Sequence, residues 1–278
     1  MLQWDSEIWG MLRGPYGSAA GASIILRQLM EEYSQERMDE LFYNYLFHQS
    51  TIYTASYAAM PYLAQLACTT SDPEARKELY INCGVIEASR EEREASPYPA
   101  SWAELEDTAG SSVCRKLYRE YMDALSRLKE LTASVFSYTA EGITDLSETR
   151  YLLAADAAYR GETPLANMLM TYITGDEYLP ECTNCGEEII VWPGNDPASG
   201  VLVVYESDPV WDRNQEPHPI IPADRLETEE LRILDERAKA AGEQTLVRQL
   251  PYLAGTTDCL SCGKTIGLWS GLLRPFGS

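Results

Sequence analysis

Two short cysteine runs constrain the fold of this chain more than any other feature. The run CTNCG begins at Cys182 and the run CLSCG begins at Cys259, so each has two thiols across a tight turn followed by glycine. This spacing lets both sulfurs of a turn reach one metal ion, and two such turns supply the four ligands of a tetrahedral zinc site. We therefore expect Cys182, Cys185, Cys259 and Cys262 to bind one zinc ion per chain.

The segments that follow the two cysteine knuckles predict the surrounding fold. Residues 187–192 and 264–269 are strand-like, and each segment ends in tryptophan, Trp192 and Trp269. A pair of knuckles that lead into strands is typical of a zinc ribbon. Four thiolates leave no open coordination position, whereas a catalytic zinc keeps one, so the metal is expected to be structural.

The other cysteines and the first residues bear on the cellular compartment. Cys68, Cys83 and Cys114 are odd in number and lie in apolar helical surroundings, which indicates buried free thiols rather than disulfides. The first residues lack the basic start and apolar core of a signal peptide, and no apolar stretch reaches about 20 residues. We expect a reduced, cytoplasmic protein that does not cross a membrane.

The charge of the chain limits its partners. The sequence has 43 acidic against 22 basic residues, a net charge of −21, which argues against nucleic acid as a ligand because phosphates require a basic surface. The excess favours either solubility alone or a basic protein partner attracted by opposite charge. The 18 tyrosines against 4 phenylalanines favour the second interpretation slightly, since tyrosine is enriched at protein interfaces.

Helical periodicity and capping signals dominate residues 1–178, which we interpret as one α-helical domain of helix pairs. Asp72 with Pro73 predicts one helix start, and Asp145 with Glu148 forms a capping box for another. The expected helices cover residues 34–48, 51–68, 73–86, 112–135, 145–161 and 163–175.

Beyond residue 178 the pattern changes to short strands between turn residues. Strands are expected over 189–192, 201–205 and 266–269, and one helix over 224–242, where Asp224 and Glu227 form a capping box. Residues 179–278 are thus predicted to be a zinc-ribbon domain with an α+β insertion between its two knuckles.

A stretch at the junction of the first two expected helices carries a family resemblance. Residues 46–63, LFHQSTIYTASYAAMPYL, resemble a segment of bacterial HEAT-repeat-like proteins of the form His-Gln-Gly-x-x-Tyr-x-Ala-Ser-Tyr-Ala-Ala-x-Pro-x-Leu, with Ser50 in place of the usual glycine. The resemblance implies a HEAT-like helical-hairpin solenoid. Proteins of this kind are found in polymorphic toxin systems, where some act as immunity partners, so the resemblance also implies a role in toxin inhibition.

Motifs for catalysis are weak. The two histidines, His48 and His218, lie in no arrangement that forms a zinc hydrolase or deaminase site, and Gly263-Lys264-Thr265 lacks the earlier glycine of a P-loop. His48 belongs to the polar cluster best suited to a function, although its imidazole can equally satisfy backbone groups where two helices meet.

We therefore expect a mainly α, non-enzymatic binding protein, most simply an immunity protein that covers the active surface of a basic bacterial toxin. The candidate contact residues are His48, Tyr53, Tyr57, Trp192 and Trp269. Two alternatives remain open at this point: an adaptor or assembly scaffold without a toxin partner, and an enzyme of unrecognised class built around His48.

Overall fold

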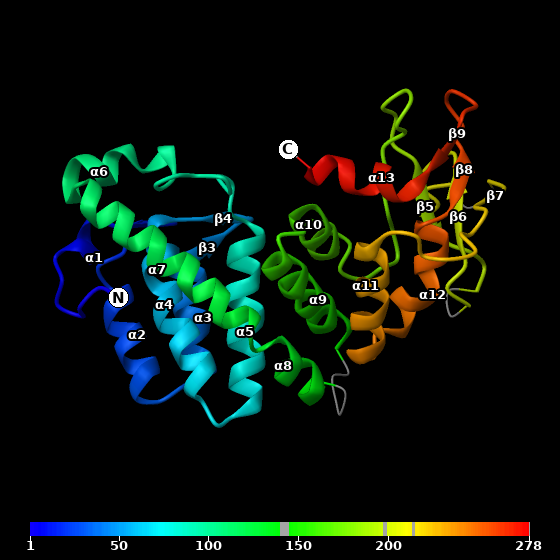
Figure 1. Ribbon diagram of the computed structural model, residues 1–278. Coiled ribbons are helices and arrows are strands. Elements are labelled where there is room, and N and C mark those ends of the chain that lie inside the picture. The colour runs from blue at the N-terminus through cyan, green and yellow to red at the C-terminus, as the bar shows by residue number, and fades with distance from the viewer. Residues whose placement is uncertain (140–144, 197–198, 213–214, 278) are drawn as a thin grey trace. The chain divides into compact units, whose positions relative to one another are not determined.

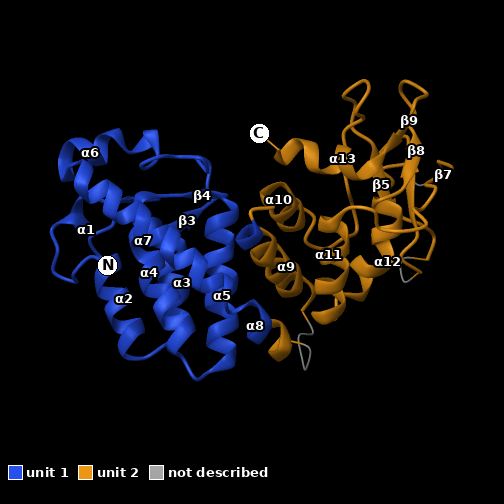
Figure 2. Ribbon diagram, in the orientation of Figure 1, with its two compact units in different colours: residues 1–135, 158–160 blue, residues 136–157, 161–278 orange. Residues whose placement is uncertain are grey.

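The computed structural model describes residues 1–139, 145–196, 199–212 and 215–277, most of which are helical (Figure 1). The chain forms two compact units, with residues 1–135 and 158–160 in unit 1 and residues 136–157 and 161–278 in unit 2 (Figure 2). The mainly α class is confirmed. The division into domains at residues 178 and 179, which rests on a change in sequence character, stays a prediction.

Unit 1 is built from short and long helices with two small hairpins. Its elements are α1 (Ile8–Met11), β1 (Arg13–Gly14), β2 (Gly17–Ser18), α2 (Ala22–Glu31), α3 (Gln35–Leu41), the π-helical η1 (Phe42–Leu46), β3 (Phe47–His48), β4 (Thr51–Ile52), α4 (Thr54–Thr69), α5 (Pro73–Ala88), η2 (Ala100–Trp102), α6 (Ala103–Ala109) and α7 (Ser111–Lys129). Helices α8 (Thr132–Thr139) and α9 (Leu146–Arg160) each contribute residues to both units.

Helix α4 forms the centre of unit 1, where it packs against α2, α5 and α7. Every residue from Ala55 to Ala64 is buried, including Pro61 inside the helix. A helix without a polar face suits a position that is covered from several sides. The predicted start of α5 is confirmed, since Asp72 Oδ1 accepts a hydrogen bond from the Glu74 amide at 2.9 Å and Pro73 is the first helical residue.

A hairpin joins η1 to α4. Strands β3 and β4 pair antiparallel with His48 opposite Thr51, and the turn residues Gln49 and Ser50 have φ angles of 49° and 58°. Positive φ at both central residues is the geometry of the tight hairpin turn that matches the twist of its strands. The expectation that one helix follows the other directly is therefore wrong, because this hairpin lies between them.

The long helix expected over residues 112–135 is also divided. Helix α7 ends at Lys129 and α8 begins at Thr132, with a turn in which the Leu131 amide donates to the Leu128 carbonyl at 2.9 Å. Apolar residues continue at helical spacing through this turn, so the sequence pattern alone did not reveal it.

Unit 2 contains the rest of α8 and α9, followed by helices and small antiparallel sheets. Its further elements are α10 (Thr163–Thr171), β5 (Ile190–Pro193), β6 (Leu202–Tyr205), β7 (His218–Pro219), α11 (Glu229–Ala240), α12 (Gln244–Leu253), β8 (Thr256–Asp258), β9 (Thr265–Gly267), α13 (Leu268–Leu273) and η4 (Arg274–Phe276). Strands β5, β6 and β7 form one sheet and β8 with β9 another. The expected boundary between α9 and α10 is confirmed, with Gly161 at φ +84°.

The region between the two cysteine knuckles differs from its prediction in two respects. Helix α11 begins at Glu229 rather than near Asp224, because the Thr228 hydroxyl accepts the capping hydrogen bond from the Leu231 amide at 3.2 Å. A second helix, α12, follows α11 and packs against it, and the sequence analysis did not predict this helix.

A buried polar cluster ties the elements of unit 2 together. Arg150 has no exposed surface, and both of its terminal nitrogens donate to the Tyr178 hydroxyl at 3.3 Å. Tyr178 donates in turn to Gln249 Oε1 at 2.8 Å, and Gln249 donates to the Gly175 carbonyl at 2.7 Å. The equally buried Glu243 carboxylate lies 3.9 Å from Arg150. These contacts fix α9 and α12 on the segment that precedes the first knuckle.

Candidate metal centre

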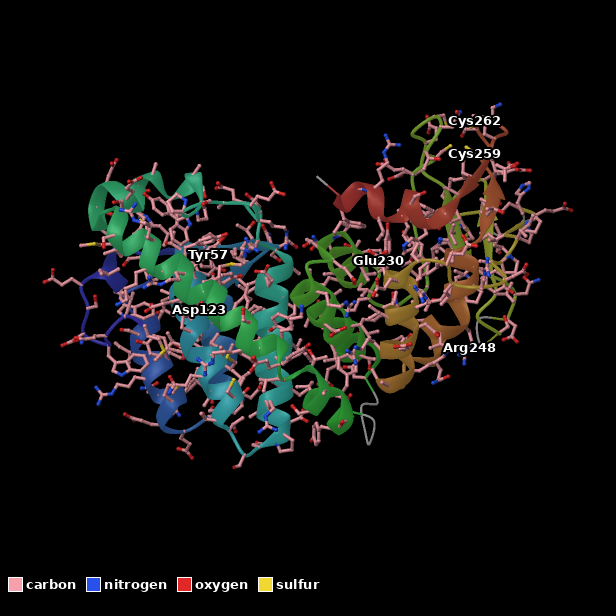
Figure 3. All side chains as sticks on the ribbon, viewed as in Figure 1. Tyr57, Asp123, Glu230, Arg248, Cys259 and Cys262 are labelled. Atoms are coloured by element: carbon pink, nitrogen blue, oxygen red, sulfur yellow. The ribbon has the colours of Figure 1, made fainter. Side chains whose placement is uncertain are left out.

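The four knuckle cysteines come together in unit 2. The Sγ atoms of Cys182, Cys185, Cys259 and Cys262 all lie within 4.8 Å of one another. The distance from Cys182 Sγ to Cys262 Sγ is 3.8 Å and that from Cys185 Sγ to Cys259 Sγ is 3.7 Å. Figure 3 shows Cys259 and Cys262 where β8 leads into β9. Sequence spacing had predicted this cluster, and the structure brings its four members together.

The two knuckles have the same backbone geometry. In the first, the Cys182 amide donates to the Glu187 carbonyl at 2.8 Å and the Gly186 amide donates to the Cys182 carbonyl at 2.9 Å. In the second, the Cys259 amide donates to the Lys264 carbonyl at 2.9 Å, and the Gly263 amide to the Cys259 carbonyl at 2.8 Å. Both turns therefore present their sulfurs in the same way.

The glycine after each knuckle is required by backbone conformation. Gly186 has a φ of +82° and Gly263 a φ of +67°, in the left-handed region that other residues rarely adopt. Space is not the reason, because a Cβ at either position would have no atom within 4 Å. The glycine in the Cys-x-x-Cys-Gly pattern thus reverses the chain after the second thiol.

Backbone amides favour the thiolate form of two of these cysteines. The amide of Cys185, with that of Asn184, lowers the pKa of the Cys182 thiol to about 6. The amide of Lys264 likewise lowers the pKa of the Cys262 thiol. The Asn184 side chain adds a contact at 3.5 Å from its Nδ2 to Cys262 Sγ. Metal ions bind thiolates, so these amides favour coordination by Cys182 and Cys262, whereas desolvation and neighbouring thiols raise the pKa of Cys185.

The arrangement fits a tetrahedrally coordinated metal ion. Zinc–sulfur bonds of about 2.3 Å place the sulfurs of a regular tetrahedron about 3.8 Å apart, as in the two pairs above. The four cysteines could therefore hold one ion between them. With four sulfurs around the ion no position remains for water or substrate, so such an ion would link chain segments rather than activate a ligand.

A close backbone contact supports the centre from the side of α13. The Glu181 amide donates to the Gly271 carbonyl at 3.0 Å, and a Cβ on Gly271 would lie only 2.2 Å from the Glu181 oxygen. The helix after the second knuckle thus reaches the segment before the first. Trp269 lies in this helix, so the strand predicted over 266–269 is wrong beyond Gly267, where β9 ends.

The candidate contact residues of unit 1 differ in exposure. His48 lies in β3, half-buried, with its ring 5.7 Å from that of the exposed Tyr16. Tyr53 precedes α4 and is also half-buried. Tyr57 is only 5% exposed, and its ring packs on those of Trp102 and Tyr121. Tyr57 therefore does not belong to an open surface, and its role as a contact residue stays a prediction.

The two tryptophans of unit 2 are half-buried. Trp192 lies in β5 opposite Val203, which confirms the first predicted strand, and the Trp269 indole donates to Glu230 Oε1 at 2.8 Å. The sequence analysis missed Trp211, which is 87% exposed beside the half-exposed Val210. The available signal was an apolar pair between Asp208-Pro209 and Asp212, in a segment that is otherwise rich in turn residues.

Comparison with known proteins yields no relative: no protein-family model, no curated protein and no solved structure matches the chain. None of the described helices has the length and apolarity that a membrane span requires.

Proposed function

We propose that this chain is a non-enzymatic protein-binding protein, an immunity-type inhibitor that covers the active surface of a basic toxin domain. The observation that carries the proposal is the net charge of −21 on a chain that also exposes large aromatic side chains. Opposite charge accelerates encounter, and buried aromatic anchors slow dissociation. Residues 46–63 add their resemblance to HEAT-like immunity proteins, and a HEAT-like solenoid belongs to the same proposal.

The exposed aromatic side chains provide specific anchors for this proposal. Trp211 is 87% exposed, Tyr16 73% and Tyr43 59%, and tryptophan and tyrosine are enriched among the residues that dominate binding energy. A tryptophan with this much exposed surface contributes little to the stability of its own fold. Trp211 therefore joins His48, Tyr53, Trp192 and Trp269 as a candidate contact residue, although these five lie in different compact units.

The metal of the four-cysteine centre is proposed to be a single structural zinc ion in a zinc-ribbon fold. The all-sulfur ligand set and the sulfur spacing near 3.8 Å both agree with zinc. In this role the ion supplies stability by linking two segments that are far apart in sequence, and binding to the partner is left to the surrounding surface.

Capture of the partner tests the proposed function. The tagged full chain is expressed in its native cell, isolated at low salt and weighed by native mass spectrometry. The expected result is a stoichiometric complex with a basic protein whose toxicity is suppressed when both are produced together. Recovery of the chain alone, or with an acidic multi-subunit assembly, would overturn the proposal and favour the scaffold alternative.

A matched pair of variants tests the aromatic anchor. Trp211→Ala is expected to weaken the captured complex by about 30-fold or more, as for a central interface residue, without lowering thermal stability. Ile24→Ala removes a side chain of similar exposure, 61%, in unit 1 and serves as the control. Equal affinity of the two variants for the partner would refute the role given to Trp211.

A further inference from the structure

Unit 1 contains a cavity of about 280 Å³ that the metal centre and the exposed aromatic residues do not explain. It lies where β4 leads into α4, and the segment after α5 and the segment around η2 complete its wall. Tyr57, which lines the cavity, is labelled in Figure 3. Pockets for drug-sized ligands measure about 300–1,000 Å³. The volume thus suits one amino-acid side chain or a molecule of similar size, rather than a nucleotide or a larger cofactor.

Two hydroxyl groups line the cavity, and one of them is buried without a partner among the described residues. Tyr57 and Ser89 both line it, and they are 5% and 9% exposed. The Ser89 Oγ is buried and forms no hydrogen bond with any described residue, whereas the Tyr57 hydroxyl does not belong to the fully buried unpaired atoms of the described residues. Burial raises the pKa of Tyr57, so its hydroxyl stays protonated and neutral. Unpaired buried polar groups are costly, and a ligand that pairs with them recovers this cost.

Aromatic rings form much of the remaining wall. Tyr57 and Trp102 meet edge to face, with their ring centres 4.7 Å apart, and Tyr53 lies beside them on the same cavity. Trp102 is 3% exposed, so its position is fixed by packing. Aromatic faces attract cations and also accommodate aliphatic chains.

The charged residues that line the cavity favour a cation over an anion, and the two arginines behind the lining, Arg90 and Arg93, both pair with Glu87. Glu91 and Glu92 line it, and the amides of Ala100 and Ser101 donate to the two oxygens of Glu92 at 2.6 and 2.9 Å. A side-chain hydrogen bond with Ser101, together with these two backbone hydrogen bonds, lowers the pKa of Glu92. Glu91 is exposed and forms no ion pair with any described residue. Arg13 is the one basic residue of the lining, and Glu104 pairs with its guanidinium.

We infer that this cavity receives a lysine side chain of the partner protein. The ammonium group has three compact donors for the Tyr57 hydroxyl, the Ser89 hydroxyl and the Glu91 carboxylate, and its aliphatic stem lies against the aromatic wall. The inference rests on the proposed function insofar as the lysine belongs to a basic partner. The cavity itself can be tested without that partner.

The test uses n-butylammonium as the probe and 1-butanol as its neutral counterpart, each titrated into the isotope-labelled full chain. Backbone amide shifts in two-dimensional NMR spectra report both location and affinity. Saturable shifts around residues 51–57, 89–92 and 99–102 are expected, with a dissociation constant in about the millimolar range for so small a probe. Butanol is expected to bind about tenfold more weakly. Equal binding of both probes, or shifts elsewhere only, would overturn the inference.

Three variants sharpen the test. Glu91→Gln is expected to weaken butylammonium binding about threefold, as for an exposed ion pair. Glu94→Gln is the control, because Glu94 lies in the same exposed segment but outside the lining, and it should leave binding unchanged. Tyr57→Phe keeps the buried ring and is expected to weaken binding about fivefold through the lost hydroxyl. Arg13→Gln removes the competing cation and is expected to strengthen binding. Unchanged affinity in both Glu91→Gln and Tyr57→Phe would refute the assigned contacts.

The two proposals fail separately. If butylammonium does not bind but the partner complex forms, the cavity is not a lysine site and the binding function stands. If butylammonium binds at the cavity but no basic partner is captured, the site accepts an amine and the immunity function fails.

Discussion

Removal of the proposed zinc ion is the perturbation with the largest expected effect. Structural zinc sites supply about 10–16 kcal/mol of apparent binding free energy in small domains, which is comparable to the about 5–15 kcal/mol by which whole proteins are stable. Here the ion would join segments that are otherwise held by the Glu181–Gly271 contact and the short β8–β9 hairpin. Without it, four sulfurs within 4.8 Å have no common partner. We expect Cys182→Ser to abolish zinc binding and to unfold the knuckles and the adjacent strands.

Zinc content and local protection provide the assay. The purified chain is expected to contain one zinc ion by elemental analysis, and Cys182→Ser none. Hydrogen exchange should then accelerate across residues 178–193 and 256–271 while α4 and α7 of unit 1 stay protected. Cys68→Ser is the matched control, because Cys68 is a free, half-buried thiol outside the metal centre. A Cys182→Ser protein with unchanged exchange rates and zinc content would refute the reasoning.

Three further predictions follow from individual contacts. Gly271→Ala is expected to lower the free energy of unfolding of the zinc-loaded chain more than Gly263→Ala does. The first substitution adds a collision with the Glu181 carbonyl, whereas the second adds only left-handed backbone strain of about 1–2 kcal/mol. A larger loss for Gly263→Ala in chemical denaturation would contradict this prediction. Arg150→Met is expected to cost about 3–5 kcal/mol at pH 7 by leaving the Glu243 carboxylate buried without its counter-charge. Burial raises the pKa of Glu243, so folding favours its protonated form. The stability loss caused by Arg150→Met should therefore shrink as the pH falls towards about 4.3, the pKa of a free glutamate. An identical loss in urea denaturation at pH 7 and pH 5 would contradict this prediction. Association with the captured partner should slow at least about tenfold between low and high salt in stopped-flow measurements, and a salt-independent rate would count against electrostatic steering.

The metal centre was predictable because its information is local. Each knuckle is defined by two cysteines and one glycine within five residues, and only the pairing of the two knuckles is long-range. The same holds for the caps at Asp72 and Asp145, where one side chain accepts from a backbone amide two residues later. Such features are determined by a few neighbouring residues and depend little on tertiary packing.

Other features depended on tertiary contacts that the sequence pattern does not contain. Trp269 continues a strand-like run, yet β9 pairs with β8 only as far as Gly267, opposite Thr256, and the chain then becomes helical. Tyr57 was expected to be a contact residue, and the packing of its ring against α7 and η2 could not be seen in the sequence. Burial of a tyrosine is decided by the elements that pack on it, which periodicity along one helix cannot identify.

The cavity beside Tyr57 could not be predicted for the same reason. Its wall combines Arg13, the start of α4, the segment after α5 and the segment from Pro99 to Trp102. Neighbouring residues in each segment gave ordinary helix or loop signals. Only the fold brings their hydroxyls and carboxylates to one place.

The distance along the chain between the two knuckles also sets an order of events during protein synthesis. Cys185 and Cys259 are 74 residues apart, so at about 5–20 residues per second the ribosome adds the second knuckle about 4–15 seconds after the first. During this interval the first knuckle has two sulfurs and no partner. The four-cysteine cluster can assemble only when the second knuckle has emerged, which makes its assembly a late step in the maturation of unit 2.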